Sequence, residues 1–185
     1  MAAGKYNDGS PTNRLVLAQR LVESMEAAWK ATVKIPIRTD DVDWRVRSVA
    51  LPLRDRLVEG EEELLQTLDK ADLELRARIR AARDLVWTRR CKTGHRIDLT
   101  CLRLGTAYVL HLPGELFVEY QLAAQEMLPD DMVCVAAYGD YGPGYIGTEI
   151  SYSQGGYETG IVSRVAPEVE AALMDGLRDL FEVSQ

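Results

Sequence analysis

The sequence lacks an excess of positive charge, a long apolar run and an N-terminal signal segment. Its 185 residues carry a net charge of −7 with a pI near 5.0, so no basic face is expected and nucleic-acid binding is excluded. No apolar run approaches the roughly 20 residues of a transmembrane helix. A charged-then-apolar leader is also missing, although any export signal would lie upstream if more chain precedes Met1.

Cysteine is equally scarce. The three cysteines, Cys91, Cys101 and Cys134, are widely spaced, odd in number and without a histidine at metal-ligand spacing. They therefore predict small buried thiols in strands.

What remains is an ordinary globular composition, with 46% hydrophobic and 28% charged residues. Periodicity predicts helices over 11–31, 59–89, 116–128 and from Ala166 onward, and strands over 42–53, 95–104, 106–112 and 132–138. Ser10-Pro11 is a predicted N-cap and first helical residue. This order indicates a single α/β domain over 1–185, with a mixed sheet flanked by helices.

Tyrosine and glycine gather in one segment. Five of the eight tyrosines fall within twenty residues, among seven glycines: Tyr138, Tyr141, Tyr145, Tyr152 and Tyr157, with Gly139, Gly142, Gly144, Gly147, Gly155, Gly156 and Gly160. A core does not need this pairing, because glycine packs nothing and a buried phenol needs a partner. A loop that brings backbone and phenols close to a ligand does need it.

The segment also contains a recognisable pattern. Pro113-Gly114-Glu115 is followed by an amphipathic stretch, an apolar strand and then Gly-Tyr-Ile-x-Thr-x-x-x-Tyr-x-x-x-x-Tyr-Glu over 144–158. This pattern resembles the C-terminal half of the catalytic domain of neutral/alkaline non-lysosomal ceramidases, particularly bacterial ceramidase-like proteins of unknown substrate. The resemblance is specific over about 45 residues and looser elsewhere.

The resemblance implies a zinc-dependent amidohydrolase. Carried over, two zinc ligands become Glu115 and Tyr152, whereas the family's two histidine ligands and catalytic serine are expected upstream of this chain. We therefore expect this chain to be the C-terminal portion of a larger catalytic domain, with little zinc and no activity alone. Its catalytic residues stay unknown, and the substrate of the complete protein is expected to be a small amide or lipid-like molecule.

Glu115 has a second interpretation from the sequence alone. An acid directly before a predicted helix is favoured by the helix dipole and accepts first-turn amides. The preceding Pro-Gly, which pins the backbone, favours the metal interpretation. A phenolate ligand such as Tyr152 is chemically possible once a metal lowers its pKa, but it depends on the resemblance.

Both histidines are expected to lie outside the metal site. His111 lies four residues before Glu115, but Pro-Gly between them excludes helical spacing, so a packed, hydrogen-bonded histidine is predicted. His95 follows Gly94 and is expected at the surface.

Substrate contacts are predicted at Tyr145, Tyr157 and Arg164. Arg164 stands where the family carries a further tyrosine, which puts ceramide itself in doubt and would suit an anionic substrate group.

Two other possibilities remain open. The chain can instead be a non-catalytic module that binds a small polar ligand through the Tyr/Gly loop. A severed half-domain would also expose apolar surface, so a homo-oligomer is expected.

Overall fold

The computed structural model describes residues 10–182, and the chain forms two compact units, residues 1–36 and 37–185. The first unit contains helix α1, Pro11–Ala31, with the predicted bounds. Its N-cap is also confirmed, because the Ser10 hydroxyl accepts a hydrogen bond from the Thr12 N–H at 3.3 Å. No residue of α1 is buried.

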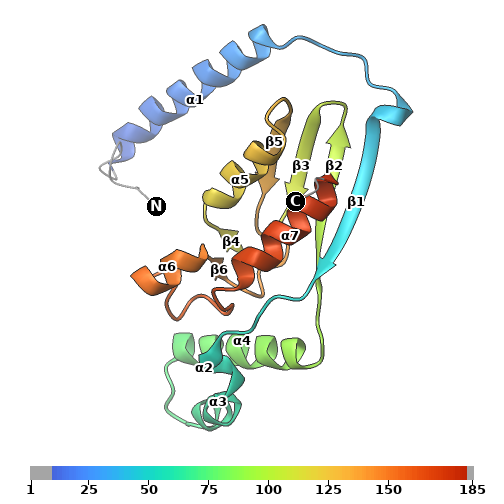
Figure 1. Ribbon diagram of the computed structural model, residues 1–185. Helices are drawn as coiled ribbons and strands as arrows, with labels where there is room; N and C mark the ends of the chain where they lie inside the picture. The colour runs from blue at the N-terminus through green and yellow to red at the C-terminus, as the bar shows by residue number, and fades with distance from the viewer. Residues whose placement is uncertain (1–9, 183–185) are drawn as a thin grey trace. The chain divides into compact units, whose positions relative to one another are not determined.

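The second unit is built on a four-stranded mixed sheet (Figure 1). Its strands are β1 (Val42–Val49), β2 (Ile97–Leu104), β3 (Ala107–His111) and β5 (Met132–Ala136), in the order β1-β2-β3-β5. The first three pair antiparallel, whereas β3 and β5 pair parallel. The predicted α/β class is confirmed, and β2 and β3 are joined by a tight turn at Gly105, whose φ is +62°.

Two helices pack against one face of this sheet. Helix α7 (Val169–Phe181) crosses β1 and β2, and α5 (Glu119–Met127) lies against β5 (Figure 1). The approach of α7 needs Gly176, because a Cβ there would lie 2.6 Å from Leu99 Cδ1. On the opposite face, Trp44 and Val46 are 54% and 53% exposed.

The long helix predicted over 59–89 is wrong. The segment forms α2 (Asp55–Val58), α3 (Glu61–Leu68) and α4 (Leu75–Lys92). The chain leaves helical geometry after Leu68, and the Glu74 side chain then caps α4 by accepting from the Ala77 N–H at 3.1 Å. Leu75, the first residue of α4, is 68% exposed and so does not continue an apolar face from α3.

The region after Pro113 also differs from the prediction. Glu115–Leu116 form a short strand, β4, that pairs in parallel with β6, Tyr145–Ile146. The expected helix therefore begins at Glu119 rather than directly after Glu115, and Glu115 is not a first-turn acid. A further helix, α6 (Glu149–Gln154), stands in the segment expected to be a loop.

The cysteines match their prediction only in part. Cys101 is buried in β2 as expected, but Cys91 lies in α4 and Cys134 is exposed. Burial raises the pKa of the Cys91 thiol to about 11, so it stays protonated at neutral pH.

A one-turn 3₁₀ helix, Thr39–Asp41, precedes β1. Within residues 10–182, no helix has the length and apolar character needed to span a membrane.

Candidate functional site

The Pro-Gly-Glu turn is held by a glycine that nothing larger can replace. Gly114 has φ of +66°, and its N–H donates to the Asp140 carbonyl at 2.8 Å. A Cβ at this position would lie 2.5 Å from the Gly144 carbonyl oxygen. Only glycine fits such a positive φ beside a neighbouring backbone, so the turn fixes where Glu115 emerges.

One peptide group connects the two halves of the sequence pattern. The Gly144 carbonyl accepts from the Glu115 N–H at 2.9 Å, and the Tyr145 N–H donates to the Val162 carbonyl at 3.4 Å. An antiparallel bridge between Gly144 and Ser163 extends the second contact. The segment that begins at Gly144 therefore lies between Glu115 on one edge and Ser163 on the other.

The half-buried Glu115 carboxylate lies beside two phenols, those of Tyr138 and Tyr145. Hydrogen bonding to Glu115 raises the pKa of Tyr145 to about 12, and partial desolvation adds to the effect. Partial desolvation, followed by the charge of Glu115, raises the pKa of Tyr138. Both phenols lie beside one carboxylate and, like tyrosines in general, stay neutral at physiological pH.

The rings of neighbouring tyrosines continue this cluster toward solvent. Tyr138 stacks on Tyr141 with ring centroids 6.0 Å apart, and Tyr145 meets the edge of Tyr157 at 5.8 Å. Tyr157 itself is 67% exposed. The structure thus brings together Glu115, Tyr145 and Tyr157 of the predicted site, and adds Tyr138 and Tyr141.

Tyr152 lies on α6 and contacts Ser163, which pairs with the other edge of the same segment. Its hydroxyl is 3.1 Å from the Ser163 hydroxyl, and the Arg54 guanidinium lies over its ring at 5.2 Å. Within residues 10–182, no hydrogen bond joins Tyr152 to Glu115. The two predicted ligands therefore flank one strand segment, each held by a different set of neighbours.

Arg164 is buried within an ion-paired network. Its Nε donates to the Asp84 carboxylate at 2.7 Å, and its Nη1 donates to the Gly142 carbonyl at 3.3 Å. Asp84 also accepts from Arg56 Nη1 at 3.1 Å. The guanidinium predicted to contact substrate is thus already engaged by a carboxylate that two arginines share.

The histidines behave differently from each other. His111 is packed and hydrogen-bonded as predicted, with Nδ1 3.2 Å from the Thr100 hydroxyl and its ring 5.5 Å from that of Trp44. His95 is half-buried against Trp87, at 6.0 Å between ring centroids, which corrects its predicted surface position.

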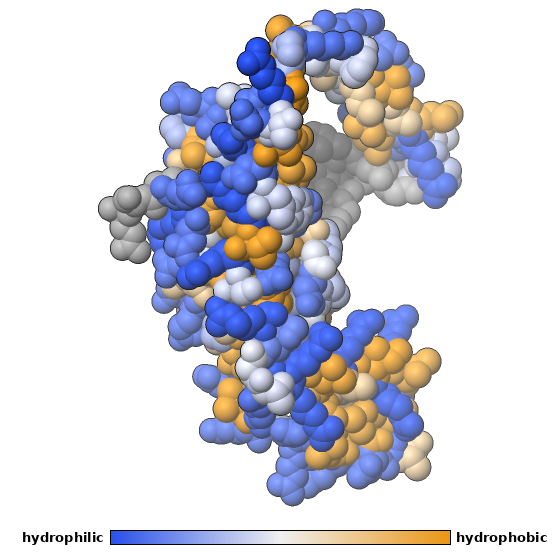
Figure 2. Space-filling view, turned by 90° about the vertical axis from the view of Figure 1, so that its right-hand side faces the viewer, coloured by the Kyte–Doolittle hydropathy of each residue, from blue (hydrophilic) through white to orange (hydrophobic). Residues whose placement is uncertain are grey.

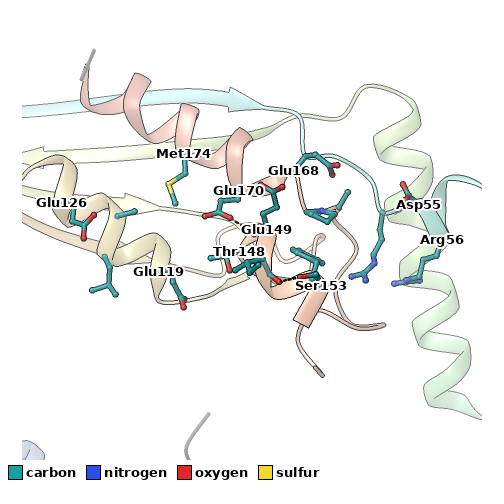
Figure 3. Close-up of a pocket in the computed structure, with 17 residues that line it drawn as sticks. Asp55, Arg56, Glu119, Glu126, Thr148, Glu149, Ser153, Glu168, Glu170 and Met174 are labelled. Atoms are coloured by element: carbon teal, nitrogen blue, oxygen red, sulfur yellow. Dashed lines mark hydrogen bonds between the residues drawn. The ribbon is translucent and has the colours of Figure 1, made fainter. Parts of the chain in front are cut away.

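A cavity of about 1190 Å³ opens next to Tyr152 (Figure 3). Carboxylates from several elements surround it: Glu119 and Glu126 from α5, Glu149 from α6, Glu168 and Glu170 at the start of α7, and Asp55 from α2. The Glu149 N–H donates to Glu170 Oε2 at 2.5 Å. Arg54 and Arg56 supply the positive charges of the wall, so the cavity is polar and predominantly acidic.

The donor set does not complete a zinc site by itself. Over residues 10–182, no group of three or more His, Cys, Asp and Glu side chains is placed to hold a metal ion. Glu115 and Tyr152 offer two oxygen donors of a suitable type, whereas zinc sites generally use three or four protein ligands.

Sequence reasoning missed the partner of Arg164. Asp84 is the one acid in α4, whose sequence also contains six arginines and one lysine. A single acid among these bases suggests an ion pair, but it does not identify Arg164, 80 residues later in the chain, as the partner.

Comparisons with known proteins gave limited similarity. No protein-family model and no curated protein matches the chain. Among solved structures, it is similar to neutral ceramidase from Pseudomonas aeruginosa, with a TM-score of 0.47 and 19% identity, over 75% of this chain and 28% of that one. A ceramidase complexed with C2 gives a TM-score of 0.46 and 18% identity, over 75% and 29%. The chain therefore spans less than a third of these proteins.

Proposed function

We propose that this chain is the C-terminal portion of the catalytic domain of a zinc-dependent amidohydrolase resembling neutral ceramidase. In this proposal Glu115 and Tyr152 supply two of the metal ligands. The remaining ligands and the nucleophile come from outside residues 10–182, so the chain alone is inactive. The metal would contribute Lewis acidity toward an amide carbonyl in the complete enzyme.

The observation that carries the proposal is the position of the Gly144–Tyr145 peptide between the two expected ligands. The Glu115 N–H donates to the Gly144 carbonyl on one edge of this segment. Ser163 pairs with Gly144 on the other edge, and the Ser163 hydroxyl contacts that of Tyr152. Glu115 and Tyr152, 37 positions apart in the sequence, are thus each linked to this short segment, Tyr152 through Ser163, which supports a shared site. Pro-Gly before Glu115 fixes this geometry through Gly114.

The cluster around Glu115 supports a role in binding substrate. Tyr145 and Tyr157 form an aromatic surface next to the carboxylate, and the neutral phenol of Tyr145 is a hydrogen-bond donor. A phenol of this kind can hold an amide oxygen, while the exposed ring of Tyr157 suits an apolar chain of a lipid-like amide. For Arg164 a substrate role requires that part of its guanidinium turn away from Asp84.

A non-catalytic binding function is the second candidate, and the cavity beside Tyr152 favours it. Its wall includes Thr148, Tyr152 and Ser153 from the Tyr/Gly segment, and its volume of about 1190 Å³ accommodates a small polar molecule. Saturable binding of such a molecule with no amidase activity in any longer form of the protein would favour this candidate.

We also propose that the chain self-associates. The sheet face opposite α7 exposes Trp44 and Val46, and exposed apolar surface is often buried by association when it forms a large patch. A symmetric homodimer would place the same face of two copies together. Light scattering over a concentration series tests this, and a strictly monomeric chain would contradict it.

The function is tested by hydrolysis of N-acyl amides with the longest polypeptide that contains this sequence. Wild type is expected to release the amine and to retain zinc, whereas Glu115→Gln and Tyr152→Phe lose most zinc and activity. Losing one of four ligands typically costs orders of magnitude in the rate of a metal-dependent step.

Glu63→Gln is the matched control, because Glu63 is an exposed carboxylate on α3 without an ion pair in residues 10–182. This variant should behave as wild type. Amidase activity that survives both Glu115→Gln and Tyr152→Phe would refute the proposed ligands.

A further inference from the structure

A second, smaller cavity lies apart from Tyr152, along the outer side of α4. Its volume is about 400 Å³, within the range of small-molecule sites. It is lined by Ala82, Arg83, Val86, Trp87 and Arg90 of α4, and by Tyr141, Gly142 and Arg164. Figure 2 shows apolar residues grouped among hydrophilic ones on the part of the molecule that contains α2, α3 and α4.

The wall of this cavity is largely apolar and aromatic. Val86 and Tyr141 are 56% and 47% exposed, so both present apolar surface to an incoming molecule. Trp87 is 98% buried and forms the floor, and its indole N–H has no acceptor within residues 10–182. The loop packs directly on this ring, because a Cβ at Gly142 would lie 2.5 Å from Trp87 Cζ3.

The charges at the rim are positive and uncompensated. Arg83 and Arg90 are exposed and seven residues apart, so they lie on the same side of α4 about two turns from each other. Within residues 10–182, neither forms an ion pair, whereas Arg164 on the inner wall is paired with Asp84. In a chain of net charge −7, two free guanidinium groups beside an apolar cavity have no evident structural partner.

We propose that this cavity binds a single anionic amphiphile, with its carboxylate at Arg83 and Arg90 and its apolar chain against Val86 and Trp87. Guanidinium groups recognise carboxylates through paired hydrogen bonds, and the apolar lining supplies the area that a simple anion cannot use. The inference uses neither Glu115 nor Tyr152, so it stands independently of the proposed amidohydrolase.

Isothermal titration of the full chain with monomeric decanoate tests the site. Wild type should bind one decanoate saturably, and the double variant Arg83→Gln/Arg90→Gln should bind at least roughly tenfold more weakly, as expected when charged hydrogen bonds are lost. Both side chains are exposed, so the variant is expected to fold. The single variants then locate the head group.

The matched control is Arg76→Gln/Arg80→Gln, which removes the same charge from exposed positions of α4 outside the cavity. It should bind decanoate as wild type does. Val86→Asp should weaken decanoate binding as strongly as Arg83→Gln/Arg90→Gln does, because it places a carboxylate in the apolar wall of the cavity.

Three results would overturn the proposal. One is equal binding of decyltrimethylammonium, which would show that only apolar contact matters. Another is an equal loss of decanoate affinity in Arg76→Gln/Arg80→Gln, or binding of the protein only to anionic phospholipid vesicles. Either result would indicate that a membrane surface contacts the whole basic helix α4. The third is that decanoate does not bind wild type at all, or that it binds Arg83→Gln/Arg90→Gln as tightly as wild type.

Discussion

Replacing Asp84 with asparagine should be among the most damaging single changes in this chain. The Asp84 side chain is 4% exposed and the Arg164 side chain 9%, so the pair lies in a desolvated environment. Breaking a buried ion pair from one side leaves an uncompensated charge and costs roughly 3–5 kcal/mol. Since a protein of this size has roughly 5–15 kcal/mol of stability, Asp84→Asn should consume a large part of it.

Urea denaturation followed by circular dichroism measures this cost. Arg164→Met should also destabilise, because it leaves the carboxylate with only the partly exposed Arg56. The double variant Asp84→Asn/Arg164→Met removes both charges and should recover part of the loss, giving a coupling energy of at least about 1 kcal/mol in a double-mutant cycle. A loss below about 1 kcal/mol for Asp84→Asn would refute the reasoning, and would leave Arg164 free for the predicted substrate contact.

Three further outcomes follow from the site. Glu115→Gln should lower the pKa of Tyr145 from about 12 toward 10, which an ultraviolet titration of phenolate absorbance detects. Because the folded pKa is the higher one, the stabilising contact is complete below about pH 10 and is lost as the pH rises toward 12, so the variant should show a flatter stability profile there. Gly114→Ala should cost roughly 1–3 kcal/mol through its positive φ and the contact with Gly144, and faster amide exchange in β4 and β6 would report the damage. Tyr152→Phe should cost about 1 kcal/mol in urea, and an unchanged midpoint would mean that the hydroxyl contact contributes nothing.

The elements that sequence reasoning located correctly are those with sustained periodicity. Helix 11–31 repeats apolar residues at helical spacing after a Ser-Pro start, and its observed bounds agree. The strand beginning at Val42 alternates because α7 contacts only one of its faces, through Arg45 and Arg47. In neither element is the apolar side buried within residues 10–182, since no residue of α1 is buried and Trp44 and Val46 are 54% and 53% exposed. The period in the sequence therefore located the elements but not the faces that pack.

The errors arise where tertiary contacts override local preference. The predicted helix 59–89 is wrong because the six residues between Leu68 and Leu75 are not helical. Most of these residue types are nevertheless compatible with a helix. Strands β4 and β6 contain two residues each, too few for any alternation to be visible. Their pairing depends on Gly114 and Gly144 approaching each other, which only the folded chain reveals.

The roles of the predicted site residues stay predictions, and the sequence did not show the surroundings of these residues. The motif singled out Glu115 and Tyr145, and the structure places these two side chains together. It could not indicate that Arg164 pairs with Asp84, 80 residues earlier in the chain, because an ion pair leaves no periodic trace. The role of Tyr152 as a ligand remains a prediction.

The central claim is that Glu115 and Tyr152 bind one metal ion, and anomalous diffraction at the zinc edge from crystals soaked in excess zinc tests it directly. Excess metal fills even a weak site that lacks its other ligands. The account predicts a single anomalous peak about 2.0–2.2 Å from a Glu115 carboxylate oxygen, with the Tyr152 hydroxyl turned from Ser163 to reach it. A peak confined to the acidic cavity beside Glu149 and Glu170, or no peak near Glu115, would contradict it.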